Sequence, residues 1–238
     1  MPRYRMPTTR WATVFIAGND ATDARKRALA ELYTMYRAPV YEFIRAMGRP
    51  EEEARDLTQG FFTTRLLEKN DVAAADPTRG KFRNWLLTAV KHYLANDRAK
   101  KLALKNDPGE IVSLDAPDTD GRCPVQIGHD VTPERIYERR WAMILLDRAL
   151  TKLEESYHKR GEGPLFDKIK PFLVDSGIEK HRDIAQELKM REETVNVAIF
   201  RCRSRFQDRI RAEIAETVNN EAEVEDELRY LYSGLQSR

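Results

Sequence analysis

Apolar side chains recur at three- and four-residue intervals along most of the chain, as they do on the buried face of a helix. This pattern predicts helices over about residues 20–47, 51–68, 81–105, 132–157, 164–174, 183–188 and 192–218. Pro39 is expected to kink or divide the first of them. No segment shows the apolar–polar alternation of a strand. The pattern therefore predicts an all-α protein.

Two segments differ in composition from the helical ones. Prolines, glycines and aspartates gather between Asn106 and Val131, as in a flexible linker. Five acids fall within Glu221–Glu227. We therefore expect two small helical domains joined by a linker. The expected parts are an N-terminal arm over 1–20, a first domain over 21–105, the linker over 106–131, a second domain over 132–218 and an acidic C-terminal tail over 219–238.

The segment Arg182–Arg211 predicts a helix-turn-helix, whose second helix enters the DNA major groove in known examples. One apolar stripe runs through both helices and contains Ile184, Ala185, Leu188, Val195, Ile199 and Phe206. The opposite face carries Asn196, Arg201, Arg203, Arg205 and Arg209. Lys189 stands in the turn where Gly is common, and Arg191 at the N-cap where Ser, Thr or Asp caps best. The alternative is a helical hairpin with a solvated basic face.

The predicted helix near residues 81–105 is strongly basic. Eight residues from Arg79 to Lys105 are Lys or Arg and one, Asp97, is acidic, a local balance of +7. The rings of Phe82, Trp85 and Tyr93 lie among them. Cations for phosphates and rings for stacking suit a single-stranded nucleic acid. The rings also follow helical spacing, so the alternative is that they belong to the core.

Composition and charge indicate which classes of protein this chain can belong to. The 238 residues carry a net charge of only +2, with 34% charged and 41% hydrophobic residues, as in a soluble globular protein. Cys123 and Cys202 match no metal or disulfide spacing, which suits the cytoplasm. The histidines lie on different elements, and no nucleophile is paired with a base. We expect no membrane span, secretory signal, metal, cofactor or enzymatic activity.

Three segments in this order carry a family resemblance. They are E-A-R-D-L-T-Q-G-F-F from Glu53, F-R-N-W-L-L from Phe82 with the basic helix that follows, and the predicted helix-turn-helix. Together they resemble bacterial RNA polymerase sigma factors of the extracytoplasmic-function type, in the sigma-70 family. The resemblance covers about residues 28–211. It implies that the first domain binds polymerase core and melts the −10 promoter region, and that the second reads the −35 duplex, without catalysis.

The resemblance also assigns residues. Polymerase binding falls on Arg55, Asp56, Thr58 and Gln59. Contacts with −10 DNA fall on the basic helix and its approach, at Arg79, Lys81, Arg83, Lys91, Asn96, Arg98, Lys100 and Lys101. Contacts with −35 DNA fall on Asn196, Val197, Phe200, Arg201, Arg203 and Arg205. The loop from Asn70 to Gly80 would hold a flipped base, with Asn70, Thr78 and Arg79 as candidate pocket residues.

Arg55 is a departure, because such factors have an acid there. The sequence D-L-T-Q-G-F-F with this depleted acidic motif resembles a group controlled by Ser/Thr protein kinases. Thr58 is three residues from Arg55, so both are expected on one helix face with Gln59. A phosphate on Thr58 would add about −1.5 to −2 charges and restore a negative surface. Thr63 and Thr64 are competing sites. A second departure is the segment His158–Lys180, longer and more charged than usual.

Two other functions fit the same pattern. A stand-alone helix-turn-helix regulator would bind DNA without polymerase core, but it does not need the aromatic–basic helix. An all-helical interaction protein would use the acidic tail to bind a partner.

Overall fold

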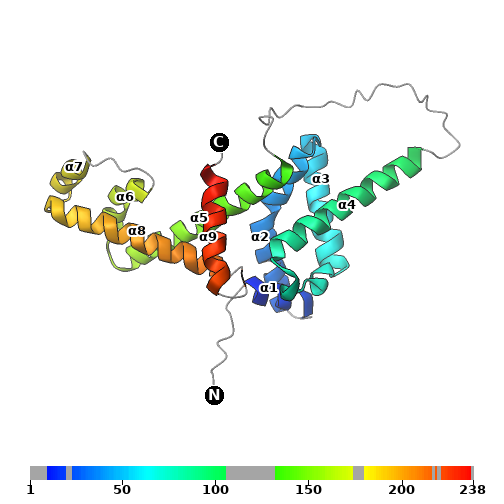
Figure 1. The fold of residues 1–238 in the computed structure, drawn as a ribbon, viewed down its shortest axis with the longest axis horizontal. Coiled ribbons are helices and arrows are strands. Elements are labelled where there is room, and N and C mark those ends of the chain that lie inside the picture. Colours follow the sequence, from blue (N-terminus) through cyan, green and yellow to red (C-terminus); the bar gives the residue numbers. More distant parts are fainter. Residues whose placement is uncertain are drawn as a thin grey trace, which may run out of the picture. The chain divides into compact units, whose positions relative to one another are not determined.

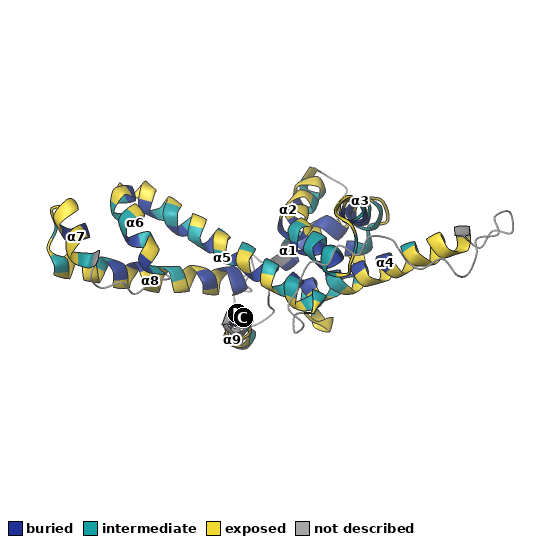
Figure 2. Ribbon diagram, turned by 90° about the horizontal axis from the view of Figure 1, so that it is seen from above, coloured by how far each residue is buried: buried dark blue, intermediate teal, exposed yellow. Residues whose placement is uncertain are grey.

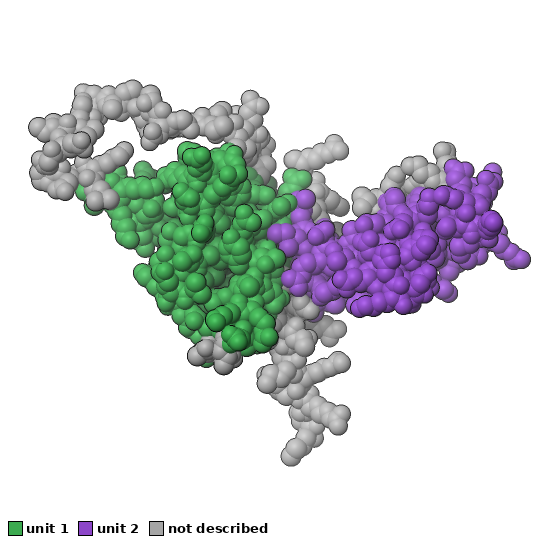
Figure 3. All heavy atoms as spheres, turned by 180° about the vertical axis from the view of Figure 1, so that it is seen from behind, with its two compact units in different colours: residues 1–142, 216–219, 229–238 green, residues 143–215, 220–228 purple. Residues whose placement is uncertain are grey.

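In the computed structural model, the described residues are 10–19, 23–105, 132–173, 180–215, 218 and 221–236. Over these residues the chain is helical with short turns and contains no strand, which confirms the predicted class (Figure 1). Buried and exposed positions alternate along the helices with the expected period (Figure 2). The predicted linker, 106–131, lies outside the described residues. The chain forms two compact units, coloured separately in Figure 3.

Unit 1 contains residues 1–142, 216–219 and 229–238. Its first elements are α1 (Arg10–Asn19), α2 (Asp23–Ala46), α3 (Glu51–Phe61), the π-helix η1 (Phe62–Glu68), the 3₁₀ turns η2 (Asp71–Ala74) and η3 (Pro77–Arg79), and α4 (Phe82–Lys105). Residues 10–19, expected in an arm, instead form a helix packed on α2 and η2. Pro39 lies buried within α2 and does not divide it.

Aromatic rings organise the core of unit 1. Phe82, at the start of α4, lies edge-on to Trp11 of α1 and to Tyr36 of α2, with centroid distances of 6.0 and 5.4 Å. Tyr36, Phe43 and Phe61 are among the largest fully buried side chains. Edge-to-face pairs of this kind add about 0.5–1.5 kcal/mol each beyond their burial. The core therefore fixes α4 against α1 and α2.

The helices α5 (Pro133–Lys159) and α9 (Glu221–Gln236) each contribute residues to both units. Within unit 1, Tyr137 of α5 lies edge-on to Phe43 at 6.4 Å, and Arg140 pairs with Glu42 at 3.1 Å. The expected acidic tail is helical over 221–236. Glu227 is buried, and Glu225 pairs with Arg211 of α8.

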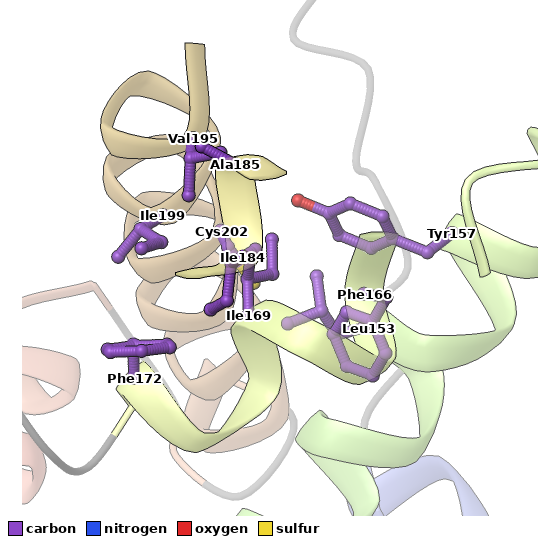
Figure 4. Packing of buried hydrophobic residues seen from close by; sticks show 10 residues of the cluster. All are labelled: Leu153, Tyr157, Phe166, Ile169, Phe172, Ile184, Ala185, Val195, Ile199 and Cys202. Carbon is purple, nitrogen blue, oxygen red and sulfur yellow. The ribbon is translucent and has the colours of Figure 1, made fainter. Parts of the chain in front are cut away.

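Unit 2 contains residues 143–215 and 220–228. It holds the rest of α5, α6 (Gly163–Ile169), the 3₁₀ turn η4 (Lys170–Leu173), α7 (Lys180–Glu187) and α8 (Glu192–Ala215). Ile184 and Ala185 of α7 pack with Val195 and Ile199 of α8, as their spacing predicted (Figure 4). The same cluster contains Leu153, Tyr157, Phe166, Ile169, Phe172 and Cys202.

Candidate nucleic-acid interface

A tight turn joins α7 to α8. Lys189 adopts the left-handed conformation, with φ of 52°, where Gly is usual. Its amide donates to the Gln186 carbonyl at 3.2 Å, and the Met190 amide donates to the Ala185 carbonyl at 2.8 Å. This is the Schellman pattern, which satisfies the last carbonyls of a helix. Lys189 therefore makes the turn that the sequence would normally assign to Gly.

One side of α8 is exposed and combines apolar with basic side chains. Phe200 is 73% exposed and Val197 is 47% exposed. Arg201, directly after Phe200, is also exposed, and it forms no hydrogen bond or ion pair with any described residue. Arginine reads guanine, and apolar side chains contact the thymine methyl group, in the major groove. These three predicted residues are available for such contacts.

The other predicted residues of α8 already have partners within unit 2. Asn196 Oδ1 lies 2.6 Å from His181 Nδ1 on α7. Arg203 Nε donates to the Phe172 carbonyl at 2.8 Å. The Arg205 guanidinium lies 5.4 Å from the centre of the Tyr157 ring. Arg203 and Arg205 therefore help to hold unit 2 together, and they also contribute positive charge to its surface.

The predicted basic surface of α4 is only partly available. Arg79, Arg98, Lys100 and Asn96 are exposed. Lys91 pairs with Glu134 of α5 at 2.7 Å, and this hydrogen bond lowers the pKa of the Glu134 carboxyl. Hydrogen bonds to Glu53 and Asp97 raise the pKa of Lys101. Lys81 is partly buried. The free positive charge is therefore smaller than the sequence count suggests.

Arg83 corrects the prediction for this helix. It was expected to contact DNA, but it is only 4% exposed. Its guanidinium lies 4.3 Å from the centre of the Trp141 ring and 5.8 Å from that of Tyr230. Because Arg83 is buried and stacks on these rings, it packs in the interior of unit 1 and is not part of the candidate interface. Sequence reasoning missed this because Trp141 and Tyr230 belong to α5 and α9.

The aromatic rings of α4 belong mostly to the core, which is the alternative that their helical spacing left open. Phe82 is 4% exposed and stacks on Trp85, with ring centroids 5.3 Å apart. Tyr93 lies edge-on to Phe61 at 5.7 Å. Trp85 and Tyr93 are half-buried, so each retains some accessible surface.

The loop expected to hold a flipped base is internally bonded. Asn70 donates to the Gly18 carbonyl at 2.7 Å and accepts a bond from Arg25 at 3.2 Å. The backbone amide and hydroxyl of Thr78 both donate to Asp76, and these bonds lower the pKa of that carboxyl. Arg79 alone among the three candidates remains exposed without such a bond to a described residue. Asn70 and Thr78 therefore act in holding the loop.

The predicted polymerase-binding residues lie on α3 but do not share one surface. Arg55, Asp56 and Gln59 are exposed, and Arg55 pairs with Glu51 one turn earlier. Thr58 is only 3% exposed, and its hydroxyl donates to the Ala54 carbonyl at 2.6 Å. The expectation that Thr58 lies on the outer face with Arg55 is therefore wrong. A kinase cannot reach a hydroxyl that is buried and bonded in this way, whereas Thr63 on the next turn is exposed.

Gln59 and Thr63 line a hollow between α2 and the α3–η1 helix. Its volume is about 460 Å³, and its apolar walls include Tyr33, Phe62 and Leu67. Tyr33 and Leu67 are 38% and 52% exposed. Sequence reasoning found Gln59 but missed this apolar groove, because its two walls come from separate helices.

Among the described residues, one group has metal-ligating atoms close together. Glu154, His158 and Asp167 each place such an atom within 4.8 Å of the others. The Lys170 ammonium already lies 3.3 Å from Glu154.

None of the described helices combines the length and apolar composition needed to cross a bilayer. No protein-family model matches the chain, and comparison with curated proteins and with solved structures finds no match either.

Proposed function

We propose that this chain is a sigma factor of the extracytoplasmic-function type, which binds RNA polymerase core in the cytoplasm and directs it to promoters. The observation that carries the proposal is the exposed face of α8. Phe200, Val197 and Arg201 gather there, beyond a tight turn and a buried seam with α7. In this proposal α7 and α8 form a helix-turn-helix that reads the −35 duplex.

In this proposal, exposed residues of unit 1 bind the opened −10 strand and polymerase core. Arg98, Lys100 and Asn96 of α4 support binding of the opened −10 strand, because cations bind its phosphates and an amide bonds its bases. Asp56 and Gln59 support docking on polymerase core, beside an apolar hollow of about 460 Å³. Arg55 and Glu51 form an ion pair and cancel each other's charge, which leaves Glu52 and Asp56 as exposed acids of α3. No catalytic step by this chain is involved.

The test is a pull-down with purified RNA polymerase core, followed by run-off transcription from genomic fragments selected by the holoenzyme. We expect a stable complex and initiation at defined start sites. Asp56→Arg with Gln59→Ala should abolish core binding, and Arg201→Ala should weaken promoter selection only. A chain that binds selected duplex DNA but not core would instead be a stand-alone regulator. That alternative is favoured by α7 and α8 lying wholly within unit 2.

A further inference from the structure

The end of α5 and the short helix α6 bring three metal-ligating side chains together in unit 2. Glu154 and His158 are four residues apart on α5, so they lie on one face of that helix, and Asp167 belongs to α6. One ligating atom of each residue lies within 4.8 Å of the other two. An imidazole with two carboxylates is a set of ligands that zinc accepts in proteins.

Each of the three ligands directly follows a residue that is buried in the core of unit 2. These buried residues are Leu153, Tyr157 and Phe166, which are 1%, 2% and 0% exposed (Figure 4). The ring centroids of Tyr157 and Phe166 are 4.9 Å apart, and this contact packs α6 against the end of α5. Packing therefore fixes the backbone of all three ligands before any ion binds, as a metal site requires.

The imidazole of His158 lies directly on the backbone of α6. A Cβ atom added to Gly163 would lie 2.5 Å from His158 Nδ1, so the ring occupies space that only glycine leaves open. The other ring nitrogen, Nε2, lies 3.9 Å from Glu154 Oε1. Tetrahedral zinc, with bonds of about 2.0–2.2 Å, needs these two atoms only about 0.5 Å closer together. Nε2 is therefore the nitrogen that faces a shared ion.

The charges around the three ligands favour a cation. The Lys170 ammonium lies 3.3 Å from Glu154 Oε2, which leaves Oε1 directed toward His158. Ligating carboxylates commonly accept such a bond on the oxygen that does not bind the metal. Asp167 is exposed and forms no hydrogen bond or ion pair with any described residue. Two carboxylates and one ammonium together carry a charge of −1.

We propose that Glu154 Oε1, His158 Nε2 and a carboxylate oxygen of Asp167 bind one Zn²⁺ ion, with water as the fourth ligand. The ion links the end of α5 to α6, and both helices contribute to the core on which α7 and α8 pack. Zinc that binds the folded unit stabilises it by mass action. The spacing of histidines in the sequence did not predict this site, because Asp167 comes from the next helix. The proposal does not rest on the function proposed above.

Isothermal titration calorimetry of the full, metal-free chain with zinc chloride tests the site. We expect one Zn²⁺ ion to bind per chain. His158→Gln and Asp167→Asn each remove one ligand at an exposed position, and each should weaken binding at least about tenfold. His92→Gln is the matched control, because His92 is an exposed histidine on α4, and it should bind zinc as the wild type does. Magnesium prefers six oxygen ligands, so it should bind at least about tenfold more weakly than zinc.

Differential scanning calorimetry provides a second measurement. Saturating zinc should raise the melting temperature of the wild type by about 5 °C or more, and EDTA should reverse the rise. Without metal, His158→Gln and Asp167→Asn should melt close to the wild type, because both side chains are exposed. Gly163→Ala tests the same ring without removing it. Its new Cβ displaces the exposed imidazole, so the affinity for zinc should fall.

Absence of zinc binding to the wild type would overturn the proposal, and so would binding that survives both His158→Gln and Asp167→Asn. Equal affinities for magnesium and zinc would also overturn it, because they would indicate an ordinary acidic surface. If His158→Gln does not fold, Gly163→Ala takes its place, and undiminished zinc affinity in that variant counts against the site. These outcomes are independent of DNA and polymerase binding, which test the proposed function separately.

Discussion

The guanidinium of Arg83 lies 4.3 Å from the centre of the Trp141 ring, joining the first turn of α4 to α5. The Tyr137 hydroxyl, one turn before Trp141, donates to the backbone carbonyl of the same arginine at 3.1 Å. Arg83 and Tyr137 are 4% and 1% exposed. The first part of α5 is therefore a structural member of unit 1, and it is attached at a residue that the sequence assigned to DNA.

Replacing Arg83 tests this structural role. Arg83→Ala removes a desolvated cation–π contact, so it should lower the free energy of unfolding of unit 1 by about 2 kcal/mol or more. Arg98→Ala on the same helix is exposed and should change it by less than about 0.5 kcal/mol. Urea unfolding followed by tryptophan fluorescence measures unit 1 alone, because Trp11, Trp85 and Trp141 all belong to it. Equal stabilities for the two variants would contradict the assignment.

Thr58 should respond to a negative charge by unfolding. Thr58→Asp places an unpaired carboxylate where the side chain is 3% exposed, so unit 1 should lose about 3 kcal/mol or more. Thr63→Asp adds the same charge at an exposed position and should leave the urea midpoint nearly unchanged. The measurement is the same tryptophan unfolding curve. A stable Thr58→Asp variant with enhanced core binding would restore Thr58 as the phosphorylation candidate.

Two neighbouring arginines of α8 should separate DNA binding from stability. Arg201→Ala should weaken binding to a duplex selected from a random library by about 1–3 kcal/mol, because the exposed side chain is free to contact a base. Its thermal melting should not change. Arg203→Ala removes the bond to the Phe172 carbonyl, so it should also destabilise unit 2, by about 1 kcal/mol. Unchanged duplex affinity in Arg201→Ala would exclude this face from DNA recognition.

Alkaline stability should depend on Tyr137. Burial raises the pKa of its phenol well above the usual value of 10.0. The unfolded chain therefore releases this proton first, and stability falls as pH rises above about 10. Tyr137→Phe should cost about 1 kcal/mol at neutral pH through the lost hydrogen bond and should show a smaller loss above pH 10. Tyr93, whose pKa is also raised by burial, keeps part of the effect in the variant. The check is the urea midpoint of both proteins against pH.

The sequence predicted the helices because their apolar spacing is a local property of each segment. Ile184, Val195 and Ile199 were expected to face one another, and all three lie in the core of unit 2. The exposed positions of Val197, Phe200 and Arg201 follow from the same spacing, because they lie opposite that stripe. The all-α class and the exposed side of α8 could therefore be predicted from the sequence alone.

The helical spacing in the sequence could not show where the buried face of α3 ends. Residues three apart on a helix are separated by about 60° around its axis, so Arg55 and Thr58 are close neighbours on α3. The boundary of the core falls between them, and Arg55 is exposed while Thr58 is buried. Only the position of the helices packed against α3 determines where that boundary lies.

The tertiary structure alone decided which basic residues remain available. Arg83, Lys91 and Lys101 are bound by side chains from other elements, and no local pattern marks those partners. The grouping of Glu154, His158 and Asp167 likewise depends on how α5 and α6 pack. The sequence by itself predicted the helices between residues 20 and 218 and the placing of charge along them, but it predicted neither α1 nor α9. Packing between distant segments determined which of those charges remain for a ligand, because burial and ion pairing depend on neighbours in space.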